Sequence, residues 1–326
     1  MSPSGFPVKF AAQQTLHVAV GVIVSRQSEV LISRRHADVH QGELWEFPGG
    51  KVECGESVEE TLRRELFEEL AITVESARPL IKVRHTYSDA KVLLDVWRVD
   101  SFSGQAEGLE GQPIKWVSVD SLANYRFPEA NLPILTAARL PEVYAILDYD
   151  SVKDEAEFSL WLERVLRLGV RLVQLRAKSL SSTAYEALSR KVCRRCEPEK
   201  VKVLLNSTPE VAIKVGAAGV HLTSKRLLSL QKRPLGSRFW VAASCHTREE
   251  LRHAQKIGVD FAVLGPVMAT KSHPGADTLG WDRFEGLVSE VSFPVYALGG
   301  LWREQVDCVR RRGGQGIAGI RAFFAD

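Results

Sequence analysis

Hydrophobic and polar positions alternate through the first part of the chain in a pattern typical of a small sheet with a helix against it. The strand-like runs cover residues 16–25, 29–35, 80–86, 91–99 and 114–119. A polar turn at Gln27–Ser28 separates the first two runs. A helix is predicted over residues 57–70, because Ser57 and Glu60 have the spacing of a capping box. These elements predict a mixed α+β fold.

The pattern changes after residue 140, where short apolar runs begin to alternate with amphipathic helical segments. Eight such runs lie at residues 143–148, 172–176, 202–206, 219–223, 240–245, 261–265, 294–300 and 316–320. Eight βα repeats predict a (β/α)₈ TIM barrel, whose active site lies at the C-terminal ends of the strands. We therefore predict two domains, residues 1–140 and 141–326, joined by a short and fairly rigid linker, since no Gly/Ser tract separates them.

Composition narrows the class of protein. The 326 residues are 45% hydrophobic and 25% charged, which excludes intrinsic disorder as the main state. No apolar run approaches the roughly 20 residues that cross a bilayer, and the N-terminal residues lack a signal-peptide pattern. Five scattered cysteines include a single Cys193/Cys196 pair, with no second pair to complete a zinc site. We expect all five to be reduced and the protein to be cytoplasmic, without a membrane partner.

The net charge of +3 is distributed unevenly. Residues 1–140 carry 15 Lys/Arg against 19 Asp/Glu, whereas residues 141–326 carry 28 against 21. This division indicates a cation-binding first half and a second half that favours anions or phosphates. No basic strip interleaved with aromatic residues accompanies the positive charge, so we do not expect a nucleic-acid polymer as partner.

Three glutamates in the predicted helix share one face. Glu65, Glu68 and Glu69 stand at i, i+3 and i+4, so their like charges repel one another. A divalent cation such as Mg²⁺, which prefers oxygen ligands and bridges to substrate phosphates, would neutralise such a cluster. The alternative is an ordinary solvated acidic face.

The surrounding residues resemble the signature of the Nudix family. Eight of its nine defined positions match, namely Gly50, Glu56, Arg64, Glu65, Leu66, Glu68, Glu69 and Ile72. Ala71 stands where the signature has glycine. Because alanine is poorly compatible with a positive φ, we expect the turn after the helix to differ slightly from that of the family. The resemblance implies an α+β Nudix fold, with a mixed sheet between helices.

The resemblance extends over about residues 16–140 and is strongest to Nudix hydrolases of the MutT type, which convert 8-oxo-dGTP to 8-oxo-dGMP and pyrophosphate. ISRRHADVHQGELWEFPGGK, LEGQPIKW and FPEANLPIL carry it. It implies Mg²⁺, with Mn²⁺ able to substitute, held by Gly49, Gly50, Glu65, Glu68, Glu69 and Glu110. The nucleotide-binding residues that it implies are Arg35, His40, Glu46, Phe47 and Asn131.

Residue chemistry suits these roles. Phe47 offers a stacking face to a base, Asn131 an amide that can donate and accept, and Arg35 a cation for phosphate or base. The alternatives are a core aromatic for Phe47 and a turn residue for Asn131. Hydrolysis of a phosphoanhydride needs positioned water and neutralised phosphate oxygens. We expect Glu65 or Glu110 to accept the water proton and Arg64 to orient the glutamates, leaving open which carboxylate is the base.

The second half resembles the thiamine phosphate synthase/TenI family. QLRAK, GVHL, SCH, LGPVMATKSHPG and ALGG carry this resemblance. The ligand-binding residues that it implies are Gln174, Arg176, Lys178, Asn206, His246, Thr270, Gly300, Ile320 and Arg321. His221, also at a strand end, is a further candidate for the site. For His221 and His246 the alternative is a structural role in the core or beside the site.

The barrel departs from the family at the positions that bear its chemistry. Ser207 and Arg226 stand where a synthase has Mg²⁺-binding aspartates, and His273 stands where it has a lysine. Pro266 replaces the histidine of the tautomerase branch. We therefore expect a degenerate barrel with a phosphate-binding, regulatory or structural role.

Three functions follow in order of preference. The first is a Mg²⁺-dependent Nudix pyrophosphohydrolase that acts on 8-oxo-dGTP in nucleotide-pool sanitation. The second is a bifunctional thiamine-pathway protein, in which the Nudix domain hydrolyses a thiamine-related diphosphate and the barrel is a synthase or tautomerase. In the third, the barrel is a non-catalytic ligand-sensing module. The expected partners are a nucleoside triphosphate and, in the barrel, a thiamine-related phosphate.

Overall fold

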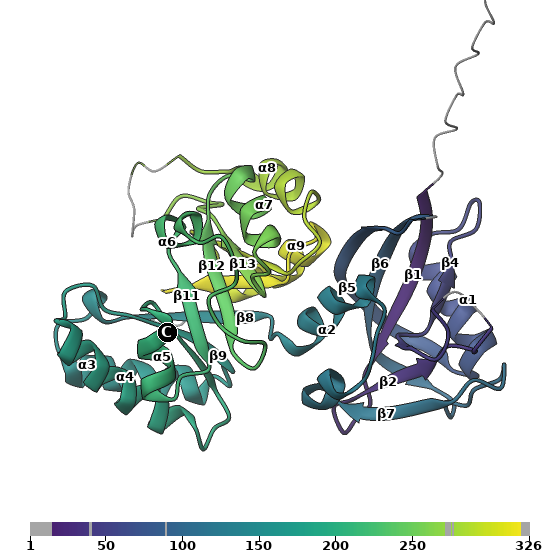
Figure 1. Ribbon diagram of the computed structural model, residues 1–326, viewed down its shortest axis with the longest axis horizontal. Coiled ribbons are helices and arrows are strands. Elements are labelled where there is room, and N and C mark those ends of the chain that lie inside the picture. The colour runs from purple at the N-terminus through teal and green to yellow at the C-terminus, as the bar shows by residue number, and fades with distance from the viewer. Residues whose placement is uncertain (1–14, 39–40, 89, 271–274, 276, 321–326) are drawn as a thin grey trace, which may run out of the picture.

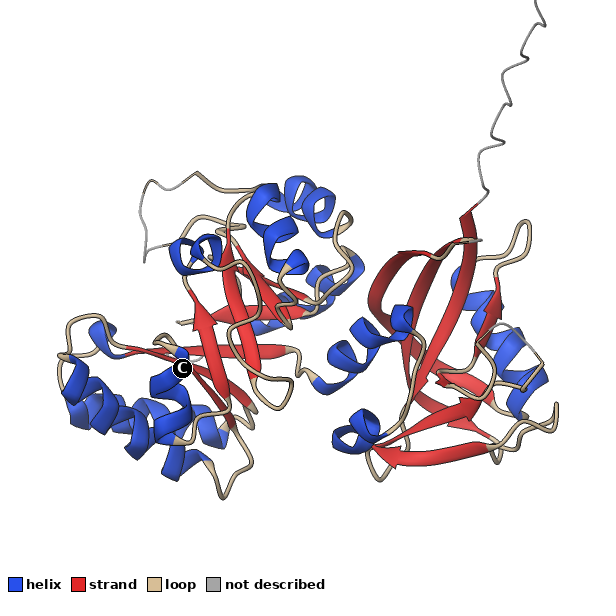
Figure 2. Cartoon of the chain, viewed as in Figure 1, coloured by secondary structure: helices blue, strands red, loops and turns tan. Residues whose placement is uncertain are grey.

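The computed structural model describes residues 15–38, 41–88, 90–270, 275 and 277–320. The N-terminal domain has the predicted mixed α+β fold, and its strands form two sheets (Figure 2). Its strands are β1 (Thr15–Ile23), β2 (Glu29–Arg34), β3 (Trp45–Glu46), β4 (Gly49–Lys51), β5 (Thr73–Thr86), β6 (Lys91–Ser103) and β7 (Ile114–Ser118). One sheet has the order β4-β1-β6-β5 and the other β3-β2-β7. Because β1 and β6 are parallel and their neighbours antiparallel, the larger sheet is mixed.

Helix α1 (Val58–Leu70) covers one face of the larger sheet. It begins at Ser57 with the predicted capping box, in which Ser57 and Glu60 bond each other's backbone N–H groups. Its apolar residues Leu62, Leu66 and Leu70 are fully buried against that sheet. Burial of this stripe fixes the rotation of the helix, and the opposite side presents the glutamates.

The turn after α1 corrects one expectation. Ala71 adopts the left-handed conformation that the family's glycine favours, with φ 57° and ψ 25°. The Ala71 N–H bonds the carbonyl oxygens of Leu66 and Phe67, which satisfies the end of the helix. The exit turn is therefore retained, and the helix cap imposes a conformation that alanine adopts only under strain.

The second half is a closed barrel of eight parallel strands, which confirms the prediction of a TIM barrel. Its strands are β8 (Val143–Asp148), β9 (Leu172–Arg176), β10 (Lys202–Leu205), β11 (Gly219–Leu222), β12 (Trp240–Cys245), β13 (Phe261–Leu264), β14 (Val295–Leu298) and β15 (Gly316–Gly319). Each matches a predicted apolar run to within about two residues at either end. The helices outside are α3 (Glu155–Arg167), α4 (Ser182–Cys196), α5 (Pro209–Val215), α6 (Ser224–Ser229), α7 (Arg248–Lys256), α8 (Gly280–Val288) and α9 (Val306–Arg311).

Aromatic side chains fill the centre of the barrel. Tyr144, Phe261 and Tyr296 are fully buried, with ring centroids 5.2–5.8 Å apart. A larger apolar layer separates the strands from the outer helices. The barrel is thus a packed core, which leaves its strand ends and loops as the places for chemistry.

Helix α2 (Leu132–Arg139) lies between the two halves (Figure 1). The side chain of Gln315, just before β15, donates to the carbonyl oxygens of Ala137 and Leu140, at 3.1 Å each. On a second contact, Arg84 of β5 donates its N–H to the Ser292 hydroxyl, which in turn donates to the Arg84 carbonyl. These two sets of hydrogen bonds connect the N-terminal half to the barrel. No helix in the described ranges is long and apolar enough to cross a membrane.

Candidate functional site

The glycine strand β4 lies directly against the acidic face of α1. A Cβ atom on Gly50 would stand 2.0 Å from the Glu65 carboxyl carbon, so only glycine permits this approach. Gly49 has a φ of 149°, and a Cβ there would stand 2.1 Å from the Ala19 carbonyl oxygen. Gly50 therefore allows the backbone of β4 to approach Glu65, and Gly49 allows it to approach the backbone of β1.

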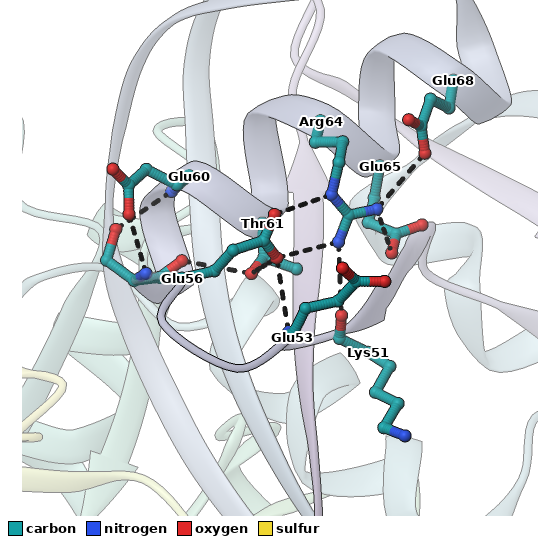
Figure 3. A network of polar contacts seen from close by, with 9 residues as sticks. Lys51, Glu53, Glu56, Glu60, Thr61, Arg64, Glu65 and Glu68 are labelled. Carbon is teal, nitrogen blue, oxygen red and sulfur yellow. Dashed lines mark hydrogen bonds and ion pairs between the residues drawn. The ribbon is translucent and has the colours of Figure 1, made fainter.

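Arg64 links the carboxylates of this segment to one another (Figure 3). Its guanidinium bonds both oxygens of Glu56, at 2.8 and 2.9 Å, and also Glu65 at 2.8 Å and Glu68 at 3.2 Å. The hydrogen bonds from Arg64 and Thr61 hold the pKa of Glu56 down at about 2. One cation thus orients three of the signature glutamates, as expected for a positioning residue.

Glu69 is the helix glutamate whose pKa is most affected by its surroundings. Burial, together with the charges of Glu110, Glu65 and Glu46, raises its pKa to about 8, against a hydrogen bond from the Gly49 backbone. The tertiary fold therefore brings four carboxylates close enough to interact, although they come from three segments of the chain. A carboxyl group of this kind remains protonated at neutral pH until a cation joins it.

A buried glutamine ties Glu110 to α1. The Gln112 side chain accepts from the Glu110 N–H at 2.9 Å and donates to the Glu69 carbonyl oxygen at 3.1 Å. The Leu109 N–H bonds the same carbonyl oxygen at 3.0 Å. Gln112 was not singled out from the sequence, since a lone glutamine in a loop carries no pattern of its own. Its contacts show why the loop after β6 delivers Glu110 to the glutamates of α1.

The donor set suits a hard divalent cation. All its side-chain ligands are carboxylates, and the excess of negative charge around Glu69 is what a cation would neutralise. Within the described parts of the chain, no three His, Cys, Asp or Glu side chains stand together closely enough to hold a metal ion in this arrangement. Arg64 engages Glu65 and Glu68 instead, so the binding of a cation would require an exchange of these contacts.

The residues with predicted nucleotide contacts meet beside this cluster. Arg35 pairs with Glu46, and burial raises the pKa of Glu46. Asn131 is 9% exposed and begins α2 without using its side chain as a cap. Phe47 is 3% exposed and stacks on Phe127 at 5.5 Å between ring centroids, so it is a core aromatic in this structure rather than an open stacking face.

Tyr87 lies near these residues as well. Its phenol bonds the Ala130 backbone beside Asn131, and the charge of Arg35 acts on it. Burial raises the pKa of Tyr87, so the group is neutral near pH 7. The sequence did not indicate it, because a tyrosine at the end of a strand is common in any sheet. His40, the remaining predicted nucleotide contact, lies outside the described residues.

The barrel gathers its predicted residues at the C-terminal ends of its strands. Arg176, at the end of β9, lies 3.6 Å from the carboxylate of Asp148, at the end of β8. Gln174, in β9, is 4% exposed and therefore buried within the barrel. Asp148 was not predicted, and its Oδ1 atom is buried without a hydrogen-bond partner. Lys178 and Asn206 line a neighbouring cavity.

The two histidines have different surroundings. His221 is fully buried, with Nδ1 3.1 Å from the Tyr144 hydroxyl and Nε2 2.8 Å from the Ser244 hydroxyl. Burial lowers its pKa to about 3. The structure therefore favours the alternative of a structural role for His221. His246 is exposed, and its Nδ1 bonds the Gly265 carbonyl oxygen at 2.6 Å.

The other predicted barrel residues lie around the later strands. Gly300 follows β14 with a φ of 64°, and a Cβ there would stand 2.4 Å from the Ala269 carbonyl oxygen, next to Thr270. Ile320 follows β15 and packs on the barrel core. Arg321 and His273 lie outside the described residues. Gly300 and Ile320 therefore both lie just after the C-terminal ends of their strands, at the same end of the barrel.

The fold and these sites define a two-domain protein with an acidic hydrolase-type site and a TIM barrel. Residues 19–137 match the NUDIX domain family, and residues 143–323 match the family described as thiamine monophosphate synthase. The chain belongs to the thiamine monophosphate synthase family and carries an N-terminal Nudix domain of the MutT type.

Individual relatives divide in the same way. The N-terminal part is 40% identical over 120 residues to the 8-oxo-dGTP diphosphatase of Escherichia coli, covering 37% of this chain and 93% of that protein. The barrel is 35% identical over 185 residues to a putative thiamine-phosphate synthase of Aquifex aeolicus, covering 57% of this chain and 98% of that protein. A solved MutT, from a study of the Aliivibrio salmonicida and Vibrio cholerae proteins, is 44% identical, with a TM-score of 0.34 over 38% of this chain and 97% of that one.

Proposed function

We propose that the N-terminal domain is a Mg²⁺-dependent pyrophosphohydrolase that converts 8-oxo-dGTP to 8-oxo-dGMP and pyrophosphate, with Mn²⁺ as a substitute metal. The observation that carries the proposal is the half-buried Glu69, which lies near Glu65, Glu110 and Glu46 and has a pKa raised to about 8. Such a concentration of carboxylates is unfavourable unless a cation neutralises it. Glu65, Glu68, Glu69, Glu110 and the backbone of Gly49 and Gly50 would hold the metal.

The bound metal would supply charge neutralisation at the phosphate oxygens and a more acidic water. The remaining functions fall to the chain itself. Glu65 or Glu110 accepts the proton of the attacking water, and Arg64 keeps Glu56, Glu65 and Glu68 in a fixed relation. Gln112 positions Glu110 through its contact with the backbone of α1.

The residues around Asn131 support the proposal that an oxidised guanine base is recognised. The Asn131 side chain does not cap helix α2, so its amide can contact a base. Tyr87 lies beside it, and Arg35 lies near Tyr87. The 8-oxo-dGTP diphosphatase of E. coli is 40% identical over this region. Sanitation of a nucleotide pool places the protein in the cytoplasm, and its five free cysteines are consistent with a reducing compartment.

A substitution within α1 tests the metal site. Glu69→Gln keeps the shape of the side chain and removes its charge, so we expect turnover of 8-oxo-dGTP to fall by about two orders of magnitude or more. Glu59→Gln is the matched control, because Glu59 lies on the same helix and pairs only with Arg63 among the described residues. The assay is pyrophosphate release with folding followed by circular dichroism. Near-normal turnover in a folded Glu69→Gln protein would refute the proposal.

A second candidate function rests on the barrel. Because the hydrolase domain is joined to a thiamine-phosphate-synthase-type domain, its substrate could instead be a thiamine-related diphosphate. Pyrophosphate or phosphate release by the full-length protein from 8-oxo-dGTP, dGTP, hydroxymethylpyrimidine diphosphate and thiamine diphosphate separates the two. A higher kcat/KM for 8-oxo-dGTP supports the first function, and a preference for either thiamine-type diphosphate supports the second.

For the barrel we propose a phosphate-binding or regulatory role rather than synthesis. The supporting observation is that Ser207 and Arg226 replace the acidic residues that the family resemblance implies for a metal.

A further inference from the structure

A cavity of about 540 Å³ opens at the C-terminal ends of three neighbouring barrel strands. Ala177 and Lys178 follow β9, Asn206 follows β10, and the remaining lining side chains follow β11. The polar lining residues are Lys178, Asn206, Thr223, Lys225, Arg226 and Ser229. The cavity thus stands where a TIM barrel places its ligands.

The lining is cationic and contains no carboxylate. Lys178, Lys225 and Arg226 contribute three positive charges, and none of them forms an ion pair with any described residue. Asp150, which follows β8, accepts hydrogen bonds from the backbone N–H groups of Lys178 and Ser179.

Some cations elsewhere on the barrel are paired with carboxylates, whereas these three are not paired with any described residue. Arg190, Arg195, Arg233 and Arg310, which lie elsewhere on the barrel, each contact a carboxylate. Three neighbouring cations repel one another, so their concentration around one cavity is unfavourable without an anion. The cavity therefore carries the charge of an anion site, and its three cations are exposed, so an anion from solution can reach them.

The same lining is unsuitable for Mg²⁺. A hard cation is held by carboxylate oxygens, whereas the oxygen donors of this cavity are an amide and hydroxyl groups beside three positive charges. The Thr223 hydroxyl is also engaged as the cap of α6, where it accepts from the Arg226 N–H at 3.3 Å. The divalent metal that the synthase resemblance implies thus does not fit these residues.

We propose that this cavity binds a diphosphate group without a divalent metal, with Lys178, Lys225 and Arg226 supplying the charge that a metal ion would otherwise supply. A diphosphate matches three cations better than a single phosphate does, since it carries more negative charge over two centres. Arg226 can offer two parallel N–H groups to one phosphate, and Asn206 can donate its amide to the other. The inference rests on the proposed non-synthase role of the barrel and is independent of the hydrolase site.

The test is isothermal titration of the full-length protein with inorganic diphosphate in EDTA. We expect binding by the wild-type chain and a loss of affinity of about tenfold or more in Lys225→Ala/Arg226→Ala, because two charge-assisted contacts are removed. Lys232→Ala/Lys256→Ala is the matched control. It removes the same charge from exposed sites on the barrel outside the cavity, and we expect it to retain wild-type affinity. Inorganic phosphate should bind more weakly than diphosphate.

Three results would overturn the proposal. The first is that the wild-type chain does not bind diphosphate in EDTA. The second is that binding appears only with Mg²⁺ and has the same affinity in Lys225→Ala/Arg226→Ala as in the wild type. The third is that the two double variants lose the same amount of affinity. The conservative variant Lys225→Arg/Arg226→Lys should keep most of the affinity, which separates loss of charge from loss of fold. Pyrophosphate release from 8-oxo-dGTP, measured on the same variants, should be unchanged. A failure of the hydrolase proposal would appear in that assay and not in the titration.

Discussion

His221 makes the barrel sensitive to acid, because its imidazole is buried in the neutral form. The side chain is 1% exposed, and burial lowers its pKa to about 3, helped by the charge of Arg176. In an unfolded chain a histidine has a pKa of about 6.5. Below that pH the unfolded chain takes up a proton that the folded barrel does not accept until the pH falls through about 3. The stability contributed by His221 is therefore complete above pH 6.5 and is lost as the pH falls.

The size of the effect follows from this difference in pKa. Between the two pKa values the free energy of unfolding falls by about 1.4 kcal/mol for each pH unit. From pH 7 to pH 5 the loss attributable to His221 is about 2 kcal/mol. Because pH 5 lies well above the folded pKa, this figure depends on the unfolded value and hardly on how far the folded pKa is lowered.

Native-state hydrogen exchange of the β11 and β12 segments at pH 7 and pH 5 measures this loss, after correction for intrinsic exchange rates. His221→Gln cannot take up the proton, although its amide can still bond Tyr144 or Ser244. We expect this variant to be less stable at pH 7, yet to lose about 2 kcal/mol less than the wild type on acidification. His36→Gln, at an exposed position, is the control. Equal pH dependence of the wild type and His221→Gln, or titration of His221 near pH 6.5 by NMR, would refute this reasoning.

Two further predictions concern helix α1. Arg64→Lys keeps the charge but loses the paired contacts to Glu56, so we expect the Mg²⁺ concentration for half-maximal turnover to rise about 10- to 100-fold. Arg63→Lys, one position away, is the control, and an equal rise there would contradict a positioning role for Arg64. Ala71→Gly relieves the left-handed strain at the helix end, and we expect the free energy of unfolding to rise by about 0.5–1 kcal/mol. Thermal unfolding checks this gain, and an unchanged or lower Tm would contradict the strain.

Two features reduce the repulsion among the carboxylates of α1. The Arg64 guanidinium bonds Glu56, Glu65 and Glu68, which relieves part of the repulsion on the outer side of α1. Glu69 has no ion pair with a described residue, and its raised pKa lowers its negative charge instead. Neither the contacts of Arg64 nor the raised pKa of Glu69 places a fixed positive charge beside Glu69. The site can therefore still accept a divalent cation.

The amino-acid sequence by itself determined the elements and much of the chemistry. Local periodicity predicted the eight barrel strands, since a fully buried parallel strand is a short apolar run between helices. The capping box at Ser57 and the spacing of Glu65, Glu68 and Glu69 are likewise local, so they could be found without a structure. The family resemblances added the expected ligands and also the positions where the barrel departs from its relatives.

Only the tertiary structure decided which distant residues meet. Gln112 and Glu110 lie near Glu69 although they are more than 40 residues away in the sequence. Tyr87, at the end of another strand, bonds the Ala130 backbone beside Asn131. Burial likewise decided that Phe47 and His221 are packed residues, and the helix cap decided that Ala71 takes a left-handed turn. Contacts and desolvation depend on the packing of whole elements, which no local pattern records, and for this reason the cationic cavity of the barrel became visible only in three dimensions.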